Sequence, residues 1–263
     1  MAEPVRTERR RDVLEICIDR PDRLNALDVA SLSALRAALE AAALDREVRA
    51  VILTGAGRAF CAGGDIRTME EHRDRGELPR LFHELTGQQE LVVREILQMP
   101  KPVVAALPGV AAGGGLSLAL AADWRIASTG AFLVPAFPAL GAVPDGGLTY
   151  FLPHFVGIGI AQELLFTNSR IPAARARELG LVHEVVDDAA LSDRAWERAA
   201  ELASGPTFAY GWLKRLIVSA FSESLETQLQ LERRGAVEAA MRTELPEGIR
   251  AFVEKRPPRF PPP

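Results

Sequence analysis

Three consecutive glycines, Gly113, Gly114 and Gly115, separate an apolar run from a helix-forming segment. Residues 103–107 predict a buried strand, and residues 116–123 predict a helix that begins directly after the glycines. The first N–H groups of a helix have no partner inside it, and the helix dipole adds partial positive charge there. Since glycine lets a ligand approach the backbone closely, the arrangement suits a developing oxyanion. A tightly packed turn without a ligand is the alternative.

A second glycine-rich turn follows another predicted strand. Residues 48–54 are apolar and β-branched, and the turn after them runs through Cys61, Ala62, Gly63 and Gly64. Such a turn can present the N–H group of Gly64. Two donors on separate strands, Gly64 and Gly114, could therefore hold one carbonyl oxygen between them.

Strands and helices alternate in the first half of the chain, which predicts an α/β fold. We expect strands at 13–18, 48–54, 103–107 and 124–127, a helix capped by Asp28 and running to residue 44, and a helix at 91–98. The charged segment 67–87 is interpreted as a mobile loop or a partly helical lid. The second half predicts helices at 147–152, 160–167, 172–179, 192–204, 207–221, 225–243 and 247–254. We therefore divide the chain into a core at 1–200 and a helical region at 201–263.

Composition argues for an ordinary globular protein of the cytoplasm. The net charge of −4 gives no reason to expect a nucleic-acid partner, although the N-terminal segment is locally basic and is expected to be a solvated face. No uninterrupted apolar stretch reaches membrane-spanning length, so we expect no membrane partner. Neither Cys17 nor Cys61 has the spacing of a metal ligand, and we expect no metal and no disulfide.

Several motifs, in order along nearly the whole chain, resemble the crotonase family, also called the enoyl-CoA hydratase/isomerase family. They are residues 20–27, 59–66, 109–123, 180–186 and 247–256. The resemblance implies a spiral core of stacked β-β-α turns, a C-terminal helical region that forms a homotrimer or a dimer of trimers, and an acyl-CoA thioester substrate. It implies no cofactor, since coenzyme A is part of the substrate. It also implies contacts to coenzyme A from Arg23, Ala26, Ala62, Asp65, Ile66 and Lys255.

The acid–base residues decide which reaction such a protein performs. Hydratases of the family use two glutamates, and the matching positions here hold Ser117 and Phe137. A serine hydroxyl is too weakly basic to replace a carboxylate, and phenylalanine has no titratable group. Asp145 remains, at the position where isomerase branches of the family, such as the ring-1,2-epoxyphenylacetyl-CoA isomerases, have their catalytic acid/base. Capping of the helix that follows is the structural alternative for Asp145. Tyr150, on that helix, is expected to line the pocket with Ser117 and Phe137, or to pack.

The sequence thus predicts an enoyl-CoA isomerase with Asp145 as acid/base and the Gly64 and Gly114 N–H groups as oxyanion donors. Three alternatives stay open: a hydratase with atypical catalytic residues, a non-catalytic acyl-CoA binding protein, and an aryl-CoA dehalogenase. The dehalogenase is disfavoured because the resemblance would require tryptophan at Phe137 and a histidine within residues 88–96, and the chain has neither.

Overall fold

The computed structural model describes residues 3–260 and has an α/β architecture built on two sheets. The six-stranded sheet has the order β1-β2-β3-β5-β7-β10, in which β1 pairs with β2 antiparallel and the other neighbours pair parallel. Its strands are β1 (Val5–Arg10), β2 (Val13–Ile18), β3 (Ala50–Gly55), β5 (Val103–Leu107), β7 (Trp124–Ser128) and β10 (Glu184–Val186). The four-stranded sheet has the order β4-β6-β8-β9, with β4 (Ala59–Cys61), β6 (Val110–Ala112), β8 (Phe132–Val134) and β9 (Ile171–Pro172).

Successive pairs of strands build a spiral. Each of the pairs β3–β4, β5–β6 and β7–β8 places its first strand in the six-stranded sheet and its second in the four-stranded sheet. Helices follow each pair: α2 (Ile66–Asp74) and α3 (Leu78–Gln98), then α4 (Gly114–Ala121), then α5 (Leu148–Val156). This repeat confirms the spiral core of β-β-α turns.

Both faces of the central strands of the six-stranded sheet are covered, and consecutive side chains of a strand point to opposite faces. On β3, Val51 and Leu53 join the main core with α1 (Val29–Leu44), whereas Ala50 and Ile52 pack with α8 (Leu191–Ala203). Asp28 caps α1 as expected, in a reciprocal capping box with Ser31. The helices α6 (Ile158–Thr167) and α7 (Ala173–Glu178) complete the core region.

Two parts of the first half have more regular secondary structure than the sequence predicted. The segment 67–87 is helical apart from a short turn, because α3 begins at Leu78 and not at residue 91. The buried stripe of α3 begins with Leu81 and Leu85. Charged neighbours and Gly87 obscured this stripe in the sequence. The basic N-terminal segment forms β1, an edge strand whose residues after Val5 are exposed, so the solvated face is confirmed.

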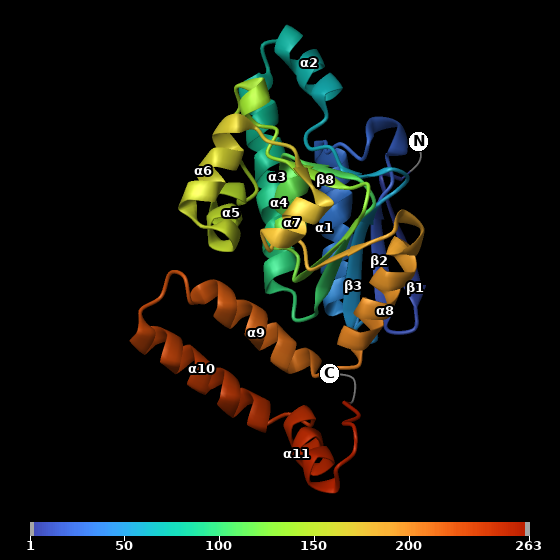
Figure 1. Cartoon of the computed structure of the whole chain (residues 1–263), viewed down its shortest axis with the longest axis vertical. Helices are drawn as coiled ribbons and strands as arrows, with labels where there is room; N and C mark the ends of the chain where they lie inside the picture. Colours follow the sequence, from blue (N-terminus) through green and yellow to red (C-terminus); the bar gives the residue numbers. More distant parts are fainter. Residues whose placement is uncertain (1–2, 261–263) are drawn as a thin grey trace.

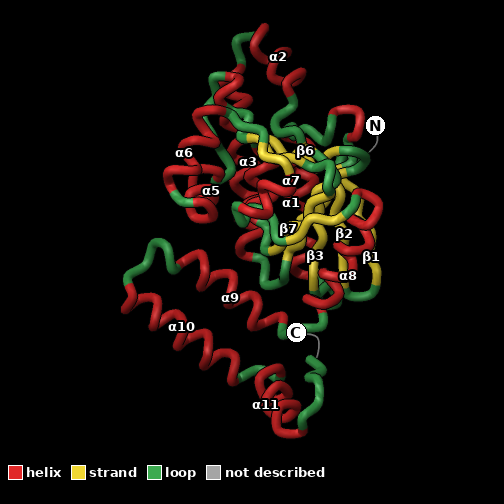
Figure 2. Tube along the Cα trace, viewed as in Figure 1, coloured by secondary structure: helices red, strands yellow, loops and turns green. Residues whose placement is uncertain are grey.

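The last helices form an arm beside the core (Figure 1). The arm contains α9 (Thr207–Ser219), α10 (Leu225–Ala240) and α11 (Glu244–Glu254), and Figure 2 shows that it consists of helices and loops. The expected boundary at 200/201 falls inside α8, which packs on the sheet through Ala199 and Ala203, so the core extends to the end of that helix. Lys214 joins α9 to the core: its Nζ donates to the carbonyl oxygens of Ile96 (2.7 Å) and Lys101 (3.0 Å).

Within residues 3–260, no helix combines the length and the apolar character needed to cross a membrane.

Candidate active site

The two glycine-rich turns meet at one edge of the four-stranded sheet. Strands β4 and β6 are parallel neighbours, so Gly63–Gly64 and Gly113–Gly114 both follow carboxyl ends of adjacent strands. The turns are in contact, since a Cβ built on Gly63 would lie 3.6 Å from the Cα of Gly113. In the described part of the chain, the N–H groups of Gly64 and Gly114 donate to no protein acceptor. Two N–H groups without a protein acceptor therefore lie on adjoining turns.

Each glycine of the triplet is required for a different physical reason. Gly113 has φ of +50°, a left-handed conformation that other residues adopt only with strain. A Cβ on Gly114 would lie 2.5 Å from the side-chain oxygen of Gln89. A Cβ on Gly115 would lie 2.7 Å from the Cβ of Cys61 and would also meet the main-chain oxygen of that residue. Gly113 therefore allows the turn that starts α4, Gly114 leaves room for Gln89, and Gly115 allows close packing on β4.

The two turns border a small cavity of about 60 Å³. Phe137 and Asp145 line it, together with apolar side chains of α2, α3 and the segment before α5, which are Ile66, Met69, Phe82, Leu85, Ala136, Leu140 and Ala142. Among the residues described, Asp145 is the only titratable group in the lining. Burial in these surroundings raises the pKa of Asp145 to about 6, and the nearby Gln89 amide opposes part of that rise. The carboxyl group is thus suited to give and take protons near neutral pH.

The Asp145 carboxyl group is held in the cavity rather than used as a helix cap. The N-cap of α5 is Gly147, and within residues 3–260 no side chain makes a capping hydrogen bond there, which removes the structural alternative for Asp145. Its Oδ1 atom is buried and has no hydrogen-bond partner in that same range. Ser117, fully buried on α4, contacts the main chain of Asp145 and not its carboxyl group: the Ser117 hydroxyl donates to the Asp145 carbonyl oxygen at 2.9 Å.

Gln89 is a site residue that the sequence analysis missed. It lies on α3 with 3% of its surface exposed and lines the cavity beside Asp145 and Gly114. A polar residue on the apolar stripe of Leu81, Leu85, Val92 and Ile96 is the signal that could have revealed it. That stripe becomes visible only when the helix is recognised from Leu78 onward.

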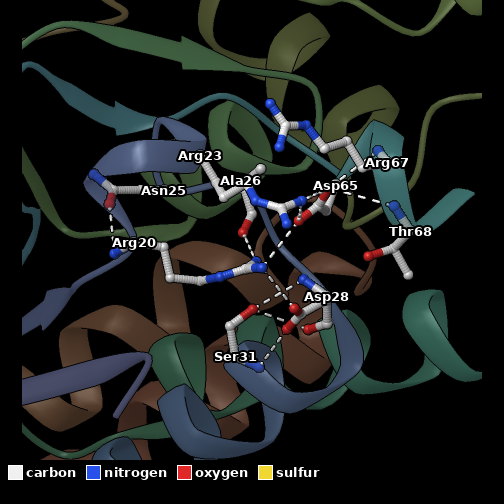
Figure 3. A network of polar contacts seen from close by, with 9 residues as sticks. All are labelled: Arg20, Arg23, Asn25, Ala26, Asp28, Ser31, Asp65, Arg67 and Thr68. Atoms are coloured by element: carbon white, nitrogen blue, oxygen red, sulfur yellow. Dashed lines mark hydrogen bonds and ion pairs between the residues drawn. The ribbon is translucent and has the colours of Figure 1, made fainter. Parts of the chain in front are cut away.

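A network of charged groups fixes the turn that carries Gly64 (Figure 3). Asp65, 3% exposed, accepts hydrogen bonds from Arg20 (2.9 Å), from Arg23 (3.2 Å) and from the first N–H groups of α2. Arg20 also pairs with Asp28 at 2.8 Å, so one guanidinium group joins the starts of α1 and α2. Main-chain hydrogen bonds from Leu27 to Gly63 (2.7 Å) and from Asp65 to Leu27 (2.8 Å) complete the attachment. The direction of the Gly64 N–H group follows from these contacts.

The residues expected to contact coenzyme A divide into three groups. Ala62 and Ile66 line the cavity, and Ile66 is 51% exposed. In the second group, the Ala26 carbonyl oxygen accepts a hydrogen bond from Arg20, and the Asp65 carboxylate already binds arginine side chains and the start of α2. Arg23 belongs here too, but 38% of its side chain stays exposed. Lys255 follows the last turn of α11, at the opposite end of the long axis from α2 (Figure 1), so it lies away from the site of its own chain.

Tyr150 does not belong to the cavity that holds Asp145. It lines two larger cavities, of about 500 and 580 Å³, that border α9, and its hydroxyl donates to the carbonyl oxygen of Val218 on that helix at 3.2 Å. Gly147, with φ of +83°, precedes α5, and Tyr150 on that helix faces the arm. Tyr150 is therefore not among the described residues that line the Asp145 cavity, and its contact with α9 agrees with the packing alternative.

In residues 3–260, no cluster of three or more histidine, cysteine or acidic side chains has the geometry of a metal site. Both cysteines, Cys17 and Cys61, are buried and free, and burial raises the pKa of each thiol to about 12. Both thiols are therefore protonated and unreactive at neutral pH.

Comparison with known proteins assigns this architecture to a family. The family model for enoyl-CoA hydratase/isomerase matches residues 8–262. The chain belongs to the enoyl-CoA hydratase/isomerase family. A 1,2-epoxyphenylacetyl-CoA isomerase of Escherichia coli is 39% identical over 94% of both chains, and a protein of Rhodobacter capsulatus named probable enoyl-CoA hydratase is 40% identical over 93% of both.

Solved structures of the family have the same fold. A crystal structure of an enoyl-CoA hydratase from Polaromonas superposes with a TM-score of 0.93 at 34% identity and covers 98% of this chain and 99% of that one. The crotonase fold is therefore shared over nearly the whole chain. Isomerase and hydratase names both occur among the relatives, so the reaction must be argued from the residues of this site.

Proposed function

We propose that the protein is an enoyl-CoA isomerase that moves a double bond of an acyl-CoA thioester, with Asp145 as its single acid/base. The observation that carries the proposal is the composition of the cavity. Among its described lining residues only Asp145 titrates, and it lies beside two N–H groups that lack protein acceptors. A shift of one proton along one face of a substrate needs a single base, whereas hydration in this family uses two carboxylates.

The thioester oxygen would accept hydrogen bonds from the N–H groups of Gly64 and Gly114. These donors polarise the carbonyl group and acidify the neighbouring C–H bond. The Asp145 carboxylate then takes a proton from the α-carbon, and the electron pair of that bond moves toward the carbonyl oxygen to give a dienolate. The Asp145 carboxylic acid returns the proton to the γ-carbon, and the β,γ double bond becomes an α,β double bond. Atoms and charge balance, and the enzyme returns to its starting state.

Ser117 and Phe137 support this reaction over hydration. Ser117 is fully buried, and its hydroxyl is engaged by the main-chain oxygen of Asp145. Phe137 contributes an apolar wall to the cavity, which raises the basicity of Asp145 by excluding water. Neither side chain can activate the water molecule that hydration requires.

Substrate entry requires side-chain movement at the cavity. Its volume of about 60 Å³ is far below the roughly 300–1,000 Å³ of typical small-molecule sites. The Met69 methyl group lies where a Cβ on Gly64 would be, so it covers the outer face of the Gly64 turn. Met69 is on α2 and Phe82 on α3, and a shift of these flexible or partly exposed side chains enlarges the acyl site. Exposed Arg23 is the candidate partner for the phosphates of coenzyme A, with Ala26, Ala62, Asp65 and Ile66 shaping the turn beside it.

The arm supports the further proposal that the chain assembles as a homotrimer or a dimer of trimers. Large apolar side chains are exposed along α9–α11, among them Leu213, Ile217, Leu225, Leu229, Met241, Ile249, Phe252 and Val253. Contiguous exposed apolar surface of this kind marks an association site. Lys255, remote from its own site, would then be available to a neighbouring subunit.

A panel of acyl-CoA thioesters tests the reaction assignment. With a β,γ-enoyl-CoA we expect a rise in the absorbance of the conjugated thioester and no hydrated product. Crotonyl-CoA should be hydrated slowly or not at all. Rapid hydration of crotonyl-CoA without any isomerisation would identify a hydratase with atypical residues, and tight binding of all thioesters without turnover would identify a binding protein.

A further inference from the structure

Gln89 stands between the two halves of the proposed catalytic machinery. It is 97% buried, on α3, and its amide is wedged between Gly114 at the start of α4 and Gly146 in the turn after Asp145. Its Nε2 atom lies 3.4 Å from the Gly114 carbonyl oxygen, which accepts one N–H of the amide. A buried amide with so few protein partners is costly unless its other groups are used.

The backbone on both sides is shaped to admit this amide. A Cβ on Gly114 would lie 2.5 Å from the Gln89 Oε1, and a Cβ on Gly146 would overlap the Gln89 Nε2. Gly146 also has φ of +57°, so the turn after Asp145 takes a left-handed conformation at the residue that faces Gln89. Two glycines on separate elements thus leave space for one side chain, which is a specific fit rather than general packing.

We infer that Gln89 is a positioning residue of this site: its buried amide, held between Gly114 and Gly146, fixes the Asp145 carboxyl group relative to the Gly114 N–H group. One N–H of the amide is used by the Gly114 carbonyl oxygen, and the second is free to meet the carboxylate. Catalytic hydrogen bonds are often long before substrate binds and shorten in the complex, which fits the buried, unpartnered Oδ1 of Asp145. Only the expected effect on turnover rests on the proposed function, because the position and the titration of Asp145 can be measured without a substrate.

Among the described residues that line the cavity, no charged side chain can take the role of Gln89 toward Asp145. The elements packed around Asp145 present Ile66 and Met69 from α2, Leu85 from α3 and Phe137 from the segment before α5, all uncharged. From α4, Ser117 reaches the main chain of Asp145, and on α5 the Tyr150 hydroxyl is directed to Val218. His83, Glu90 and Arg94 of α3 line the larger neighbouring cavity instead. Burial raises the pKa of Asp145, and Gln89 is the group that lowers it.

The test measures the titration of Asp145 directly, without turnover. The infrared band of its protonated carboxyl group, assigned by its loss in Asp145→Asn, is followed against pH in the full-length protein. Gln89→Met keeps the length of the side chain and removes the N–H donors. We expect the pKa of Asp145 to rise by about one unit in Gln89→Met, since the donor to the ionised form is lost. Gln88→Met, on the same helix outside the cavity, is the matched control and should titrate as wild type.

A second variant keeps the test decisive if Gln89→Met folds poorly. Gln89→Glu preserves size and shape, and its carboxyl group beside Asp145 should raise the pKa of Asp145 further and couple the two titrations. In the kinetic readout, the acid limb of the kcat/KM profile should move to higher pH in both variants, with KM within a few-fold of wild type. An unchanged Asp145 titration in folded Gln89→Met and Gln89→Glu would overturn the inference. A shifted titration in a protein that catalyses no isomerisation would leave it standing and reject the proposed function.

Discussion

At the scale of single residues, burial of Asp145 links the proposed chemistry to stability. Its pKa in the folded protein is about 6, above the ordinary value of 3.8, so the folded state binds the proton more tightly than the unfolded state does. The stabilisation is complete below pH 4 and is lost as the pH rises through 6. By linkage, a shift of about two units corresponds to about 3 kcal/mol of unfolding free energy lost at neutral pH.

Asp145→Asn removes this ionisation and should therefore stabilise the protein at neutral pH. We expect its unfolding free energy to exceed that of wild type by up to about 3 kcal/mol at pH 8, and to match it at pH 4. Urea denaturation at both pH values provides the measurement. A variant less stable than wild type at pH 8 would show that the ionised carboxylate is a structural element.

Substitution of Gly114 and of Gly115 by alanine should affect different properties, activity in the first case and stability in the second. Gly114→Ala places its Cβ against the end of the Gln89 side chain and not against backbone, so the protein should stay folded while kcat/KM falls by about 10²-fold as Gln89 and Asp145 shift. Gly115→Ala places its Cβ against Cys61 and the backbone of β4, and should cost about 1–3 kcal/mol of stability. Thermal unfolding and turnover, measured on both variants, test the contrast. Equal loss of stability in the two would mean that the triplet is a packing turn only.

At the scale of elements, the sequence predicted the parts whose residues act locally. The two glycine turns, the Asp28 cap and the apolar runs of β2, β3 and β5 are readable because each depends on neighbours in the chain. Tyr150 could not be placed from spacing alone, because the left-handed Gly147 sets where α5 points. Gln89 and Arg20 escaped notice because their importance arises from contacts with residues far along the chain. The spiral topology itself came from the resemblance, not from periodicity.

The start of α2 depends on Asp65, which both caps the helix and pairs with Arg20. Removing one partner of a buried ion pair typically costs about 3–5 kcal/mol, so Asp65→Asn should lower the unfolding free energy by about that amount. The variant should also lose activity, because the Gly64 turn is anchored beside the same carboxylate. Asp22→Asn, a nearby exposed carboxylate, is the control and should change stability by less than about 0.5 kcal/mol. Wild-type stability and turnover in Asp65→Asn would contradict the anchoring role.

At the scale of the whole molecule, the arm is the part that a single chain leaves uncovered. Phe252 and Val253 on α11 are 86% and 73% exposed, and such apolar surface is stable in water when another subunit covers it. We expect sedimentation to give a mass three or six times 28.5 kDa, and Phe252→Asp to weaken the assembly. The exposed Glu254→Gln should leave the assembly unchanged. A wild-type monomer at micromolar concentration would contradict the proposed trimer.

The kinetics of Asp145→Asn with a β,γ-enoyl-CoA test the central claim most directly. The substitution keeps the size of the side chain and removes the base. We predict that kcat for double-bond migration falls by about two to four orders of magnitude, the usual contribution of general acid–base catalysis, while acyl-CoA affinity is nearly unchanged. Turnover within a few-fold of wild type in a folded Asp145→Asn protein would contradict the account, because no other titratable group lines the described cavity.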